Sequence, residues 1–275
     1  MVIQNSVRKS LRGTAVITGA SAGLGALFAD RFAKRGYDLL LVARRATRLE
    51  TLSRSLKERY GVGTAWIAAD LGNPIELDDV VRTLATDNSI SLLVNNAGTA
   101  TLGKVADSEP DDLAAMVNVN IVALTRLSTA VLAGFKQRDR GAIMNIGSVL
   151  GLHSLPISSI YSGTKGYVLN FTRGLQEEVA GTGVRVHLVL PAAIATDLWE
   201  VSGVSLSHLD PSTVMSAEDA VDAILAGFDS GESITLPSAE NPDLFLSYDN
   251  ARIAVLAASQ TSVPASRYSA KRQQK

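Results

Sequence analysis

Short apolar runs alternate with segments of helical periodicity along most of the chain. The apolar runs are mostly continuous, as expected for strands of a parallel sheet that helices cover on both faces. Between them, apolar side chains recur at helical spacing, and Asn73 followed by Pro74 is typical of a helix start. The predicted strands are residues 15–18, 39–43, 65–68, 91–94, 142–146, 185–190 and 233–236, and the predicted helices are residues 24–35, 48–60, 74–86, 111–135, 161–179 and 217–228.

The unbroken alternation predicts a single α/β domain with a doubly wound parallel sheet of about seven strands and helices on both faces. We assign this domain to residues 13–236. Residues 1–12 do not resemble a signal peptide and are expected to be a flexible, basic N-terminus. Residues 197–216 interrupt the alternation and predict a long surface loop. Residues 237–275 are a C-terminal extension with a possible helix at 244–258 and a basic tail.

The composition argues against several classes of function. Charged residues make up 19% of the 275 residues, and 26 Lys and Arg against 27 Asp and Glu give a net charge of −1. No overall positive field would therefore draw the protein to nucleic acid or to anionic lipid. The absence of cysteine excludes disulfides, thiolate metal sites and cysteine nucleophiles, and three scattered histidines predict no metal site. These features are compatible with a cytoplasmic protein.

The longest run without a charged residue, 141–164, is long enough on paper to span a bilayer. It contains Asn145, His153 and Pro156 together with several serines and glycines, a composition that is unfavourable in hydrocarbon. We therefore expect no membrane segment here, but a buried strand and turn that keep a reaction centre apolar.

A glycine-rich turn follows the first predicted strand and contains Gly19, Gly23 and Gly25. Such a turn lets the backbone approach a diphosphate closely and places it at a helix N-terminus, so it predicts a dinucleotide site. The same segment contains Gly19-x-Ser21-x-Gly23, the pattern of a serine-hydrolase nucleophile turn. A hydrolase also needs an oxyanion-hole loop from an earlier strand. Too few residues precede this turn for such a strand, so we favour the dinucleotide site.

The residues after the second strand favour NADP over NAD. A dinucleotide site needs a residue there that recognises the adenosine ribose, and an acidic side chain would favour NAD. Here Ala43 is followed by Arg44 and Arg45, whose guanidinium groups suit a 2′-phosphate. The alternative is that both arginines simply begin a solvent-exposed helix.

Candidate catalytic residues lie on the predicted helix 161–179 and on the strand before it. Tyr161 and Lys165 are four residues apart and therefore share one helix face. A nearby cation favours the phenolate, which would lower the pKa of the tyrosine towards the range of a general acid or base. Ser148 lies at the end of a strand, where the active sites of open α/β sheets are found.

Together these residues make the sequence resemble the short-chain dehydrogenase/reductase family over residues 13–236. The matching motifs occur in the family's order along the chain. They are Thr18-Gly19-x-x-x-Gly23-x-Gly25, Asp70-Leu71, Asn95-Asn96-Ala97-Gly98, Asn120 within Asn118-Val119-Asn120, Ser148, Tyr161-x-x-x-Lys165, and Pro191 with Thr196. The family's usual Pro-Gly after the sixth strand is Pro191-Ala192 here, and the alanine methyl could tighten the nicotinamide pocket.

The resemblance implies a role for each matching residue. Tyr161 would donate a proton to a carbonyl oxygen while the nicotinamide delivers a hydride to the carbon, and Ser148 would hydrogen-bond that oxygen. Lys165 would lower the pKa of the tyrosine and bind the nicotinamide ribose. Asn120 would position a water in the proton relay, and Asn118 would be structural. The cofactor would lie against Gly19, Ser21, Ala22, Gly23, Leu24, Gly25, Arg44, Arg45, Asp70, Leu71, Asn96, Ala97, Gly98, Tyr161, Lys165, Pro191, Ile194 and Thr196.

We therefore expect an NADP(H)-dependent reductase of ketones or aldehydes that also acts in reverse as an alcohol dehydrogenase. One alternative is a 3-oxoacyl-thioester reductase of acyl-carrier chains. Its partner would need a basic patch, which Arg126, Arg138 and Arg140 do not visibly form in the sequence. A second alternative is a non-catalytic NADP-binding regulator, which would be expected to lack part of the Ser-Tyr-Lys-Asn set.

The expected partners follow from the same residues. Apolar side chains in residues 198–215 predict a mobile cover over a bulky or apolar carbonyl substrate. The resemblance implies a homodimer or homotetramer formed through the helices at 111–135 and 161–179. The extension 237–275 either adds to such an interface or covers the active site.

Overall fold

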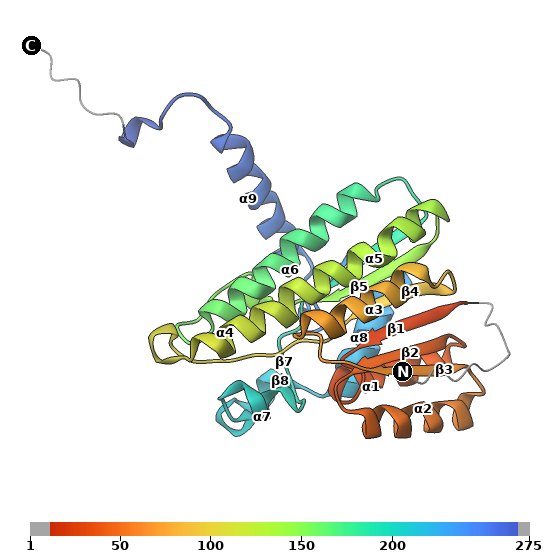
Figure 1. The fold of residues 1–275 in the computed structure, drawn as a ribbon. Coiled ribbons are helices and arrows are strands. Elements are labelled where there is room, and N and C mark those ends of the chain that lie inside the picture. The colour runs from red at the N-terminus through yellow and green to blue at the C-terminus, as the bar shows by residue number, and fades with distance from the viewer. Residues whose placement is uncertain (1–11, 269–275) are drawn as a thin grey trace, which may run out of the picture. The chain divides into compact units, whose positions relative to one another are not determined.

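Seven parallel strands form the central sheet of the computed structural model, which describes residues 12–268 (Figure 1). Their order across the sheet is β3-β2-β1-β4-β5-β6-β9. The strands are β1 (Thr14–Thr18), β2 (Asp38–Ala43), β3 (Thr64–Ala68), β4 (Ile90–Asn95), β5 (Gly141–Ile146), β6 (Val184–Val189) and β9 (Ile234–Thr235). The strand order reverses between β1 and β4, so the predicted doubly wound α/β fold is confirmed.

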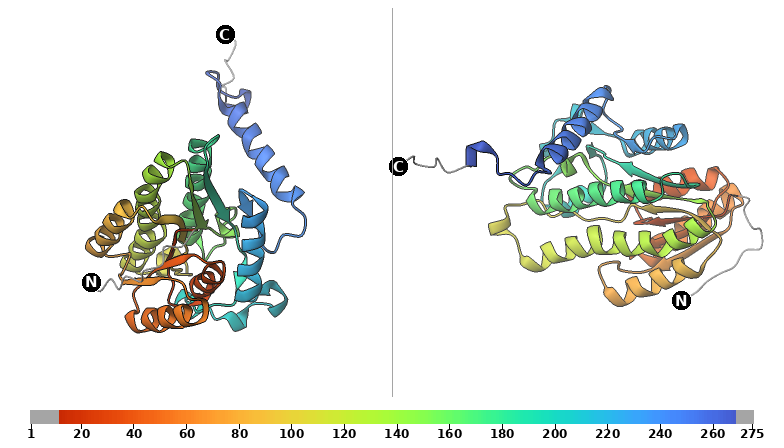
Figure 2. Two further views of the ribbon diagram at one scale, coloured as in Figure 1. Left: turned by 90° about the vertical axis from the view of Figure 1, so that its right-hand side faces the viewer. Right: turned by 90° about the horizontal axis from the view of Figure 1, so that it is seen from above.

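Helices cover both faces of this sheet, as the end-on view in Figure 2 shows. One face carries α1 (Gly23–Lys34), α2 (Ala46–Tyr60) and α8 (Ala217–Ser230), and the other carries α3 (Pro74–Thr86), α5 (Leu124–Gln137) and α6 (Ser159–Glu178). Phe28, Leu49 and Ile224 are fully buried in the first core. Leu77 and Leu127 lie in the second core. Burial on both sides explains why the strands are continuous apolar runs.

The predicted helix 111–135 is interrupted in the structure. It consists of α4 (Pro110–Val117), a π-helical segment (Asn118–Ala123) and α5. π-helical turns occur frequently at functional sites, and this one contains the buried Asn120. Among the described residues, the path Pro110–Gln137 has the length and composition to cross a membrane, but 44% of its apolar window is buried within the protein. Core helices of soluble proteins meet the same criterion.

The prediction of a long surface loop at residues 197–216 is wrong in part. The segment contains α7 (Leu198–Ser202), two 3₁₀ turns and β8 (Val214–Met215), which pairs in parallel with β7 (Ala193–Ile194). The indole nitrogen of Trp199 also donates to the carbonyl of Ile194 at 2.8 Å. Two-residue strands and a single helical turn leave too few positions for a periodic pattern, so the sequence could not reveal them.

The described part of the C-terminal extension belongs to a second compact unit, which begins at Ala239. It contains α9 (Asp243–Ser259), at the place predicted for a helix, and a 3₁₀ turn at Ser266–Tyr268. None of the residues of α9 is buried. The predictions for residues 1–11 and for the basic tail at 269–275 lie outside the described residues.

Candidate active site

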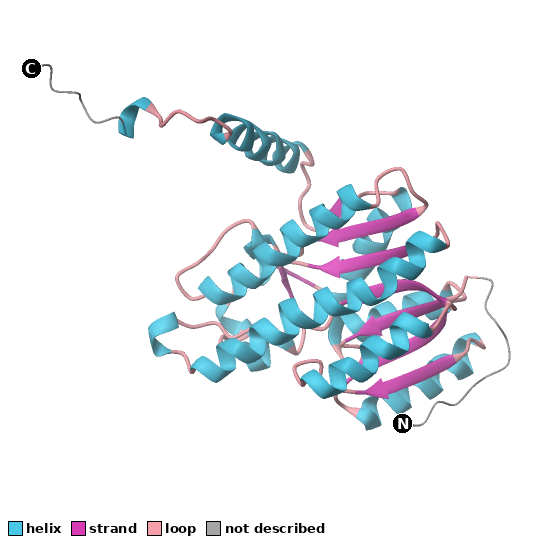
Figure 3. Ribbon diagram, turned by 45° about the horizontal axis from the view of Figure 1, so that its top comes forward, coloured by secondary structure: helices cyan, strands magenta, loops and turns pink. Residues whose placement is uncertain are grey.

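The predicted site residues gather at the carboxyl ends of the strands, which point to one side in Figure 3. Thr18 at the end of β1 joins this edge to the end of β4. Its hydroxyl accepts hydrogen bonds from the backbone N–H groups of Asn96 and Ala97 at 3.0 and 2.9 Å. The Asn96 side chain donates in return to the Thr18 carbonyl at 2.9 Å. Thr18 therefore holds the start of the glycine turn against the end of β4, where the strand order reverses.

The glycine turn has the backbone conformation that its sequence predicts. Gly19 and Gly23 adopt φ values of +68° and +51°, which side chains disfavour. Ala22 at the start of α1 makes no side-chain cap hydrogen bond. The first N–H groups of α1 are therefore available for an anion, as a dinucleotide diphosphate requires.

We expect Gly25→Ala to abolish NADPH binding. A methyl group at this buried position would lie 2.7 Å from the Asn96 amide nitrogen and would overlap the carbonyl oxygen of Gly19, so the turn would have to move. A fluorescence titration with NADPH measures the loss. Gly174→Ala on α6 is the matched control, because a methyl group there meets no atom within 4 Å. Unchanged NADPH affinity in Gly25→Ala would show that the turn does not hold the diphosphate.

Two arginines lie beside this turn, at the end of β2. Arg44 and Arg45 are both exposed, and the Arg45 guanidinium donates to the Ser21 hydroxyl at 3.0 and 3.1 Å. A third arginine, Arg48, forms an ion pair with Asp197 at 3.6 Å, which links α2 to the segment after β7. The sequence placed Arg48 on a helix and gave no signal for this contact.

The other predicted cofactor residues lie along the same edge. Asp70 and Leu71 follow β3, where the Asp70 carboxylate accepts from the backbone of Gly72 at 2.9 Å. A methyl group on Gly98, after β4, would lie 3.8 Å from the Lys165 ammonium. The predicted cofactor residues after β6 are Pro191, Ile194 and Thr196. Those around the start of α1 are Ala22, Leu24 and Gly25.

The predicted catalytic side chains Ser148, Tyr161 and Lys165 come together between β5 and α6. The Ser148 hydroxyl caps the turn after β5 by accepting from the backbone of Leu150 at 3.1 Å, and it lies 3.4 Å from the Pro191 carbonyl. It also hydrogen-bonds the Tyr161 hydroxyl. One helical turn further on, Lys165 donates to the Ile146 carbonyl at 2.9 Å, and its nitrogen lies 5.6 Å from the centre of the tyrosine ring.

Burial controls the proton affinity of this pair. Burial raises the pKa of Tyr161 to about 12, and the hydrogen bond to Ser148 acts in the opposite direction. Burial also lowers the pKa of Lys165 to about 8. The pKa of the tyrosine is thus raised rather than lowered, because desolvation of the phenolate is the largest effect. Tyr161 is a protonated acid at neutral pH.

Asn120 holds the backbone on the other side of Lys165. Its side-chain carbonyl accepts from the N–H of Thr99, and its amide donates to the Thr99 carbonyl, both at 2.9 Å. The amide also donates to the Thr164 hydroxyl at 3.1 Å. Both amide hydrogens are therefore used by protein groups, so any water that this residue positions would bind one of its acceptors. Asn118 is exposed, which agrees with the choice of Asn120 over Asn118.

A chain of buried polar side chains behind the site was missed. Asn95 donates to Ser128 and to Asn145, each at 2.9 Å, and Asn145 donates to Thr172 at 3.0 Å. This chain joins the ends of β4 and β5 to α5 and to α6, the helix that carries Tyr161 and Lys165. The available signal was an asparagine at or near the carboxyl end of each of two largely apolar strands.

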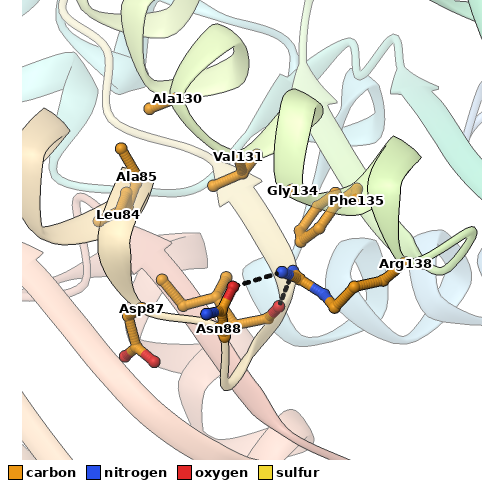
Figure 4. A pocket seen from close by; sticks show the side chains of 10 residues that line it. Leu84, Ala85, Asp87, Asn88, Ala130, Val131, Gly134, Phe135 and Arg138 are labelled. Atoms are coloured by element: carbon orange, nitrogen blue, oxygen red, sulfur yellow. Dashed lines mark hydrogen bonds between the residues drawn. The ribbon is translucent and has the colours of Figure 1, made fainter.

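A small pocket between α3 and α5 lies elsewhere (Figure 4). In it Arg138 donates to the Ile90 carbonyl at 3.1 Å, where β4 begins. The pocket therefore lies at the edge of the sheet where the strands begin, away from the predicted site at their carboxyl ends. Its lining residues are Leu84, Ala85, Asp87, Asn88, Ile90, Ala130, Val131, Gly134, Phe135 and Arg138.

A comparison with known protein families agrees with the family that the sequence motifs and this geometry indicate. The family model described as short chain dehydrogenase matches residues 13–204, well over half of the chain. The chain belongs to the short-chain dehydrogenases. The resemblance seen in the sequence motifs is therefore confirmed.

Solved structures and curated relatives are also similar to this dehydrogenase. A short-chain dehydrogenase from Sphingobium yanoikuyae in complex with NADPH is 39% identical with a TM-score of 0.90, covering 93% of this chain and all of that one. A bulky-bulky ketone specific alcohol dehydrogenase from Comamonas testosteroni is 37% identical with a TM-score of 0.86, covering 93% of this chain and 98% of that one. The very-long-chain 3-oxoacyl-CoA reductase of Anas platyrhynchos is 33% identical over 74% of this chain, which spans only 66% of that relative's length.

The pH dependence of this dehydrogenase should report Lys165. Its ammonium loses its proton above a pKa of about 8, whereas Tyr161 stays protonated up to about 12. We expect carbonyl reduction to be level through neutral pH and to decline above about pH 8, as the cation is lost. Lys165→Arg keeps a charge at all these pH values, so its pH–rate profile should lack this decline even if its rate is lower. The same decline in Lys165→Arg would assign it to another group.

Proposed function

We propose that this short-chain dehydrogenase reduces a ketone or aldehyde to an alcohol with NADPH, and that it catalyses the reverse reaction. The observation that carries the proposal is the convergence of Ser148, Tyr161 and Lys165 at the carboxyl end of β5. A protein that only bound the cofactor would not need a protonated phenol, a hydroxyl and a buried ammonium at one point.

Each side chain has a distinct task in the proposed reaction. A nicotinamide bound at this edge supplies a hydride to the carbonyl carbon. The Tyr161 hydroxyl gives its proton to the carbonyl oxygen, and the Ser148 hydroxyl hydrogen-bonds the same oxygen and holds it in line. The Lys165 cation stabilises the phenolate that remains, in a buried setting where screening is weak. In alcohol oxidation the same groups act in the opposite order.

Arg44 and Arg45 are proposed to select NADPH. Both stand exposed at the end of β2, and Arg45 already points to the glycine turn. Removing both in an Arg44→Ala, Arg45→Ala variant should weaken NADPH binding by at least roughly 10- to 150-fold, the value of one charge-assisted hydrogen bond, and leave NADH binding unchanged. Fluorescence titrations measure both affinities, with Arg54→Ala on the exposed side of α2 as the control. Equal wild-type affinities for NADPH and NADH would contradict this selection.

The proposed substrate is a bulky, apolar ketone. The backbone N–H of Leu102, after β4, donates to the Ser202 carbonyl of α7 at 2.7 Å, and Gly103 donates to the Ile157 carbonyl at 2.8 Å. These bonds join three segments on the substrate side of the site. Large apolar side chains are exposed on them, including Leu155, Ile157 and Val201. The specificity of the similar Comamonas enzyme for bulky-bulky ketones supports the same substrate class here.

A 3-oxoacyl thioester is the second candidate substrate, favoured by the curated relatives that reduce very-long-chain 3-oxoacyl-CoA. Steady-state NADPH consumption with aryl ketones and with 3-oxoacyl-CoA esters of increasing length distinguishes the two. We expect the higher kcat/KM for the bulky ketones. A higher value for the thioesters would reverse the choice. NADPH binding without turnover of any carbonyl compound would instead support a non-catalytic regulator.

A further inference from the structure

The segment between β7 and α7 crosses the carboxyl edge of the sheet. It comes after β6, whereas the glycine turn follows β1, and β4 and β5 lie between these two strands in the sheet. Thr196 nevertheless lies against the turn, because a methyl group on Gly23 would be 3.4 Å from the Thr196 side chain. The next residue, Asp197, pairs with Arg48 in the first turn of α2, which follows β2 on the other side of β1. The segment therefore passes in front of the glycine turn from one side to the other.

This segment, residues 193–197, is called the strap below, and its two ends are held differently. At the inner end β7 pairs with β8, and the indole nitrogen of Trp199 donates to the Ile194 carbonyl at 2.8 Å. At the outer end the Asp197 carboxylate meets the Arg48 guanidinium. The strap thus has a fixed inner end, and an ion pair ties its outer end to α2.

The outer tie is suited to opening and closing. Its charged groups are 3.6 Å apart, and the side chains of Arg48 and Asp197 are 55% and 54% exposed. An exposed ion pair of this kind contributes little to the stability of the fold. Its loss would leave the hydrogen bonds of the sheet and of β7 with β8 intact, so the strap opens at its outer end while the fold remains.

We propose that the ion pair of Arg48 with Asp197 closes the strap over the bound dinucleotide and slows its release. The free N–H groups at the start of α1 suit the diphosphate. Arg44 and Arg45 lie at the adenosine end of the same edge, and Tyr161 lies at the nicotinamide end. A dinucleotide that extends between these points runs beneath the strap. The proposal rests on the dinucleotide site and not on the carbonyl substrate, so it adds control of cofactor exchange to the proposed function.

A direct contact of Arg48 with the 2′-phosphate is the alternative role. Arg48 lies one helical turn beyond Arg44 and Arg45, so its guanidinium is close enough to the same end of the cofactor to be considered. Its charge is balanced by Asp197 in the structure, which weakens its attraction for a phosphate. The two roles make opposite predictions for removal of the Asp197 charge. Loss of the tie speeds NADPH release, whereas a freed Arg48 that bound the phosphate would slow it.

Stopped-flow release of NADPH from the full chain distinguishes the two roles. The complex is mixed with excess NADP⁺, and dissociation is followed by NADPH fluorescence. We expect Asp197→Asn and Arg48→Gln each to raise the dissociation rate constant about 1.5- to fivefold, the value of an exposed ion pair. The double variant should release NADPH no faster than either single one, because each substitution removes the same contact. Arg48→Lys keeps the cation and should remain closer to wild type than Arg48→Gln.

Two controls make this result specific to the strap. Glu178→Gln breaks the half-exposed ion pair of α6 with Lys136 of α5 and should leave NADPH release unchanged. High salt should bring the rate ratio of Asp197→Asn to wild type towards one, since screening weakens the exposed pair in the wild type.

Three outcomes would overturn the strap proposal. Release from Asp197→Asn at the wild-type rate would show that the ion pair does not retain the cofactor. Slower release from Asp197→Asn, together with faster release from Arg48→Gln, would assign Arg48 to the 2′-phosphate. A wild-type protein that did not bind NADPH would overturn the strap and the dinucleotide site together. Faster release from both single variants in a protein that reduced no carbonyl compound would instead support the strap and contradict only the proposed reaction.

Discussion

Tyr161→Phe is expected to bind NADPH normally and to lose roughly 10²- to 10⁴-fold in kcat for carbonyl reduction, the contribution typical of a positioned general acid. The substitution removes one hydroxyl and keeps the ring, so the packing of α6 changes little. The hydroxyl is the proton donor in our account, because burial keeps the pKa of Tyr161 at about 12 and hence keeps it protonated. NADPH absorbance measures turnover, and NADPH fluorescence measures binding.

Tyr167→Phe is the matched control for this experiment. Tyr167 lies on the same helix, where its hydroxyl hydrogen-bonds Thr125 at 2.8 Å on the exposed surface. Removal of this hydroxyl should leave kcat within about twofold of wild type, since exposed substitutions have small effects. Retention of activity in Tyr161→Phe at the level of this control would refute the role of the Tyr161 hydroxyl.

Ser148→Ala is expected to reduce kcat by roughly 10²- to 10³-fold, the cost of removing one donor to a developing oxyanion. The Ser148 hydroxyl also accepts from the Leu150 backbone at 3.1 Å, so part of the loss could come from a displaced turn. Ser148→Thr keeps the hydroxyl and separates the two effects. We expect Ser148→Thr to recover a measurable part of kcat, with NADPH affinity close to wild type in both variants.

Two outcomes would contradict the role proposed for the Ser148 hydroxyl. If Ser148→Ala keeps wild-type kcat, the hydroxyl does not polarise the carbonyl. If NADPH affinity falls in parallel with kcat, Ser148 acts on the cofactor pocket through the turn after β5. A hydrogen bond to the substrate oxygen instead predicts that the loss is confined to catalytic steps with bound substrate.

The sequence predicted the parts of this protein that repeat a strong local pattern. The strands β1 and β5 are largely apolar runs, and the turn with Gly19, Gly23 and Gly25 directly follows the first strand and leads into a helix. Tyr161 and Lys165 could be paired because a helix places residues four apart on one face. The structure brings Tyr161 to Ser148, as the strand-end position implied, and places Lys165 near the tyrosine ring.

Features that depend on contacts between distant segments could not be predicted. The ion pair of Arg48 with Asp197 joins α2 to the segment after β7. The clamp of Asn120 on Thr99 depends on the π-helical turn, which has no sequence signature in this chain. The raised pKa of Tyr161 depends on how deeply the folded protein buries it. The four-residue spacing of Tyr161 and Lys165 indicated only that the lysine would lower this pKa.

The most direct test of the account is the transfer of deuterium from NADPH to a bulky ketone. NADPH deuterated at the transferable position of the nicotinamide is incubated with the full chain and an aryl ketone, and the alcohol is analysed by mass spectrometry. The account predicts one deuterium on the carbinol carbon with wild type, formed much more slowly with Tyr161→Phe. An enzyme that binds NADPH yet forms no deuterated alcohol, or forms it equally fast without the Tyr161 hydroxyl, would contradict the account.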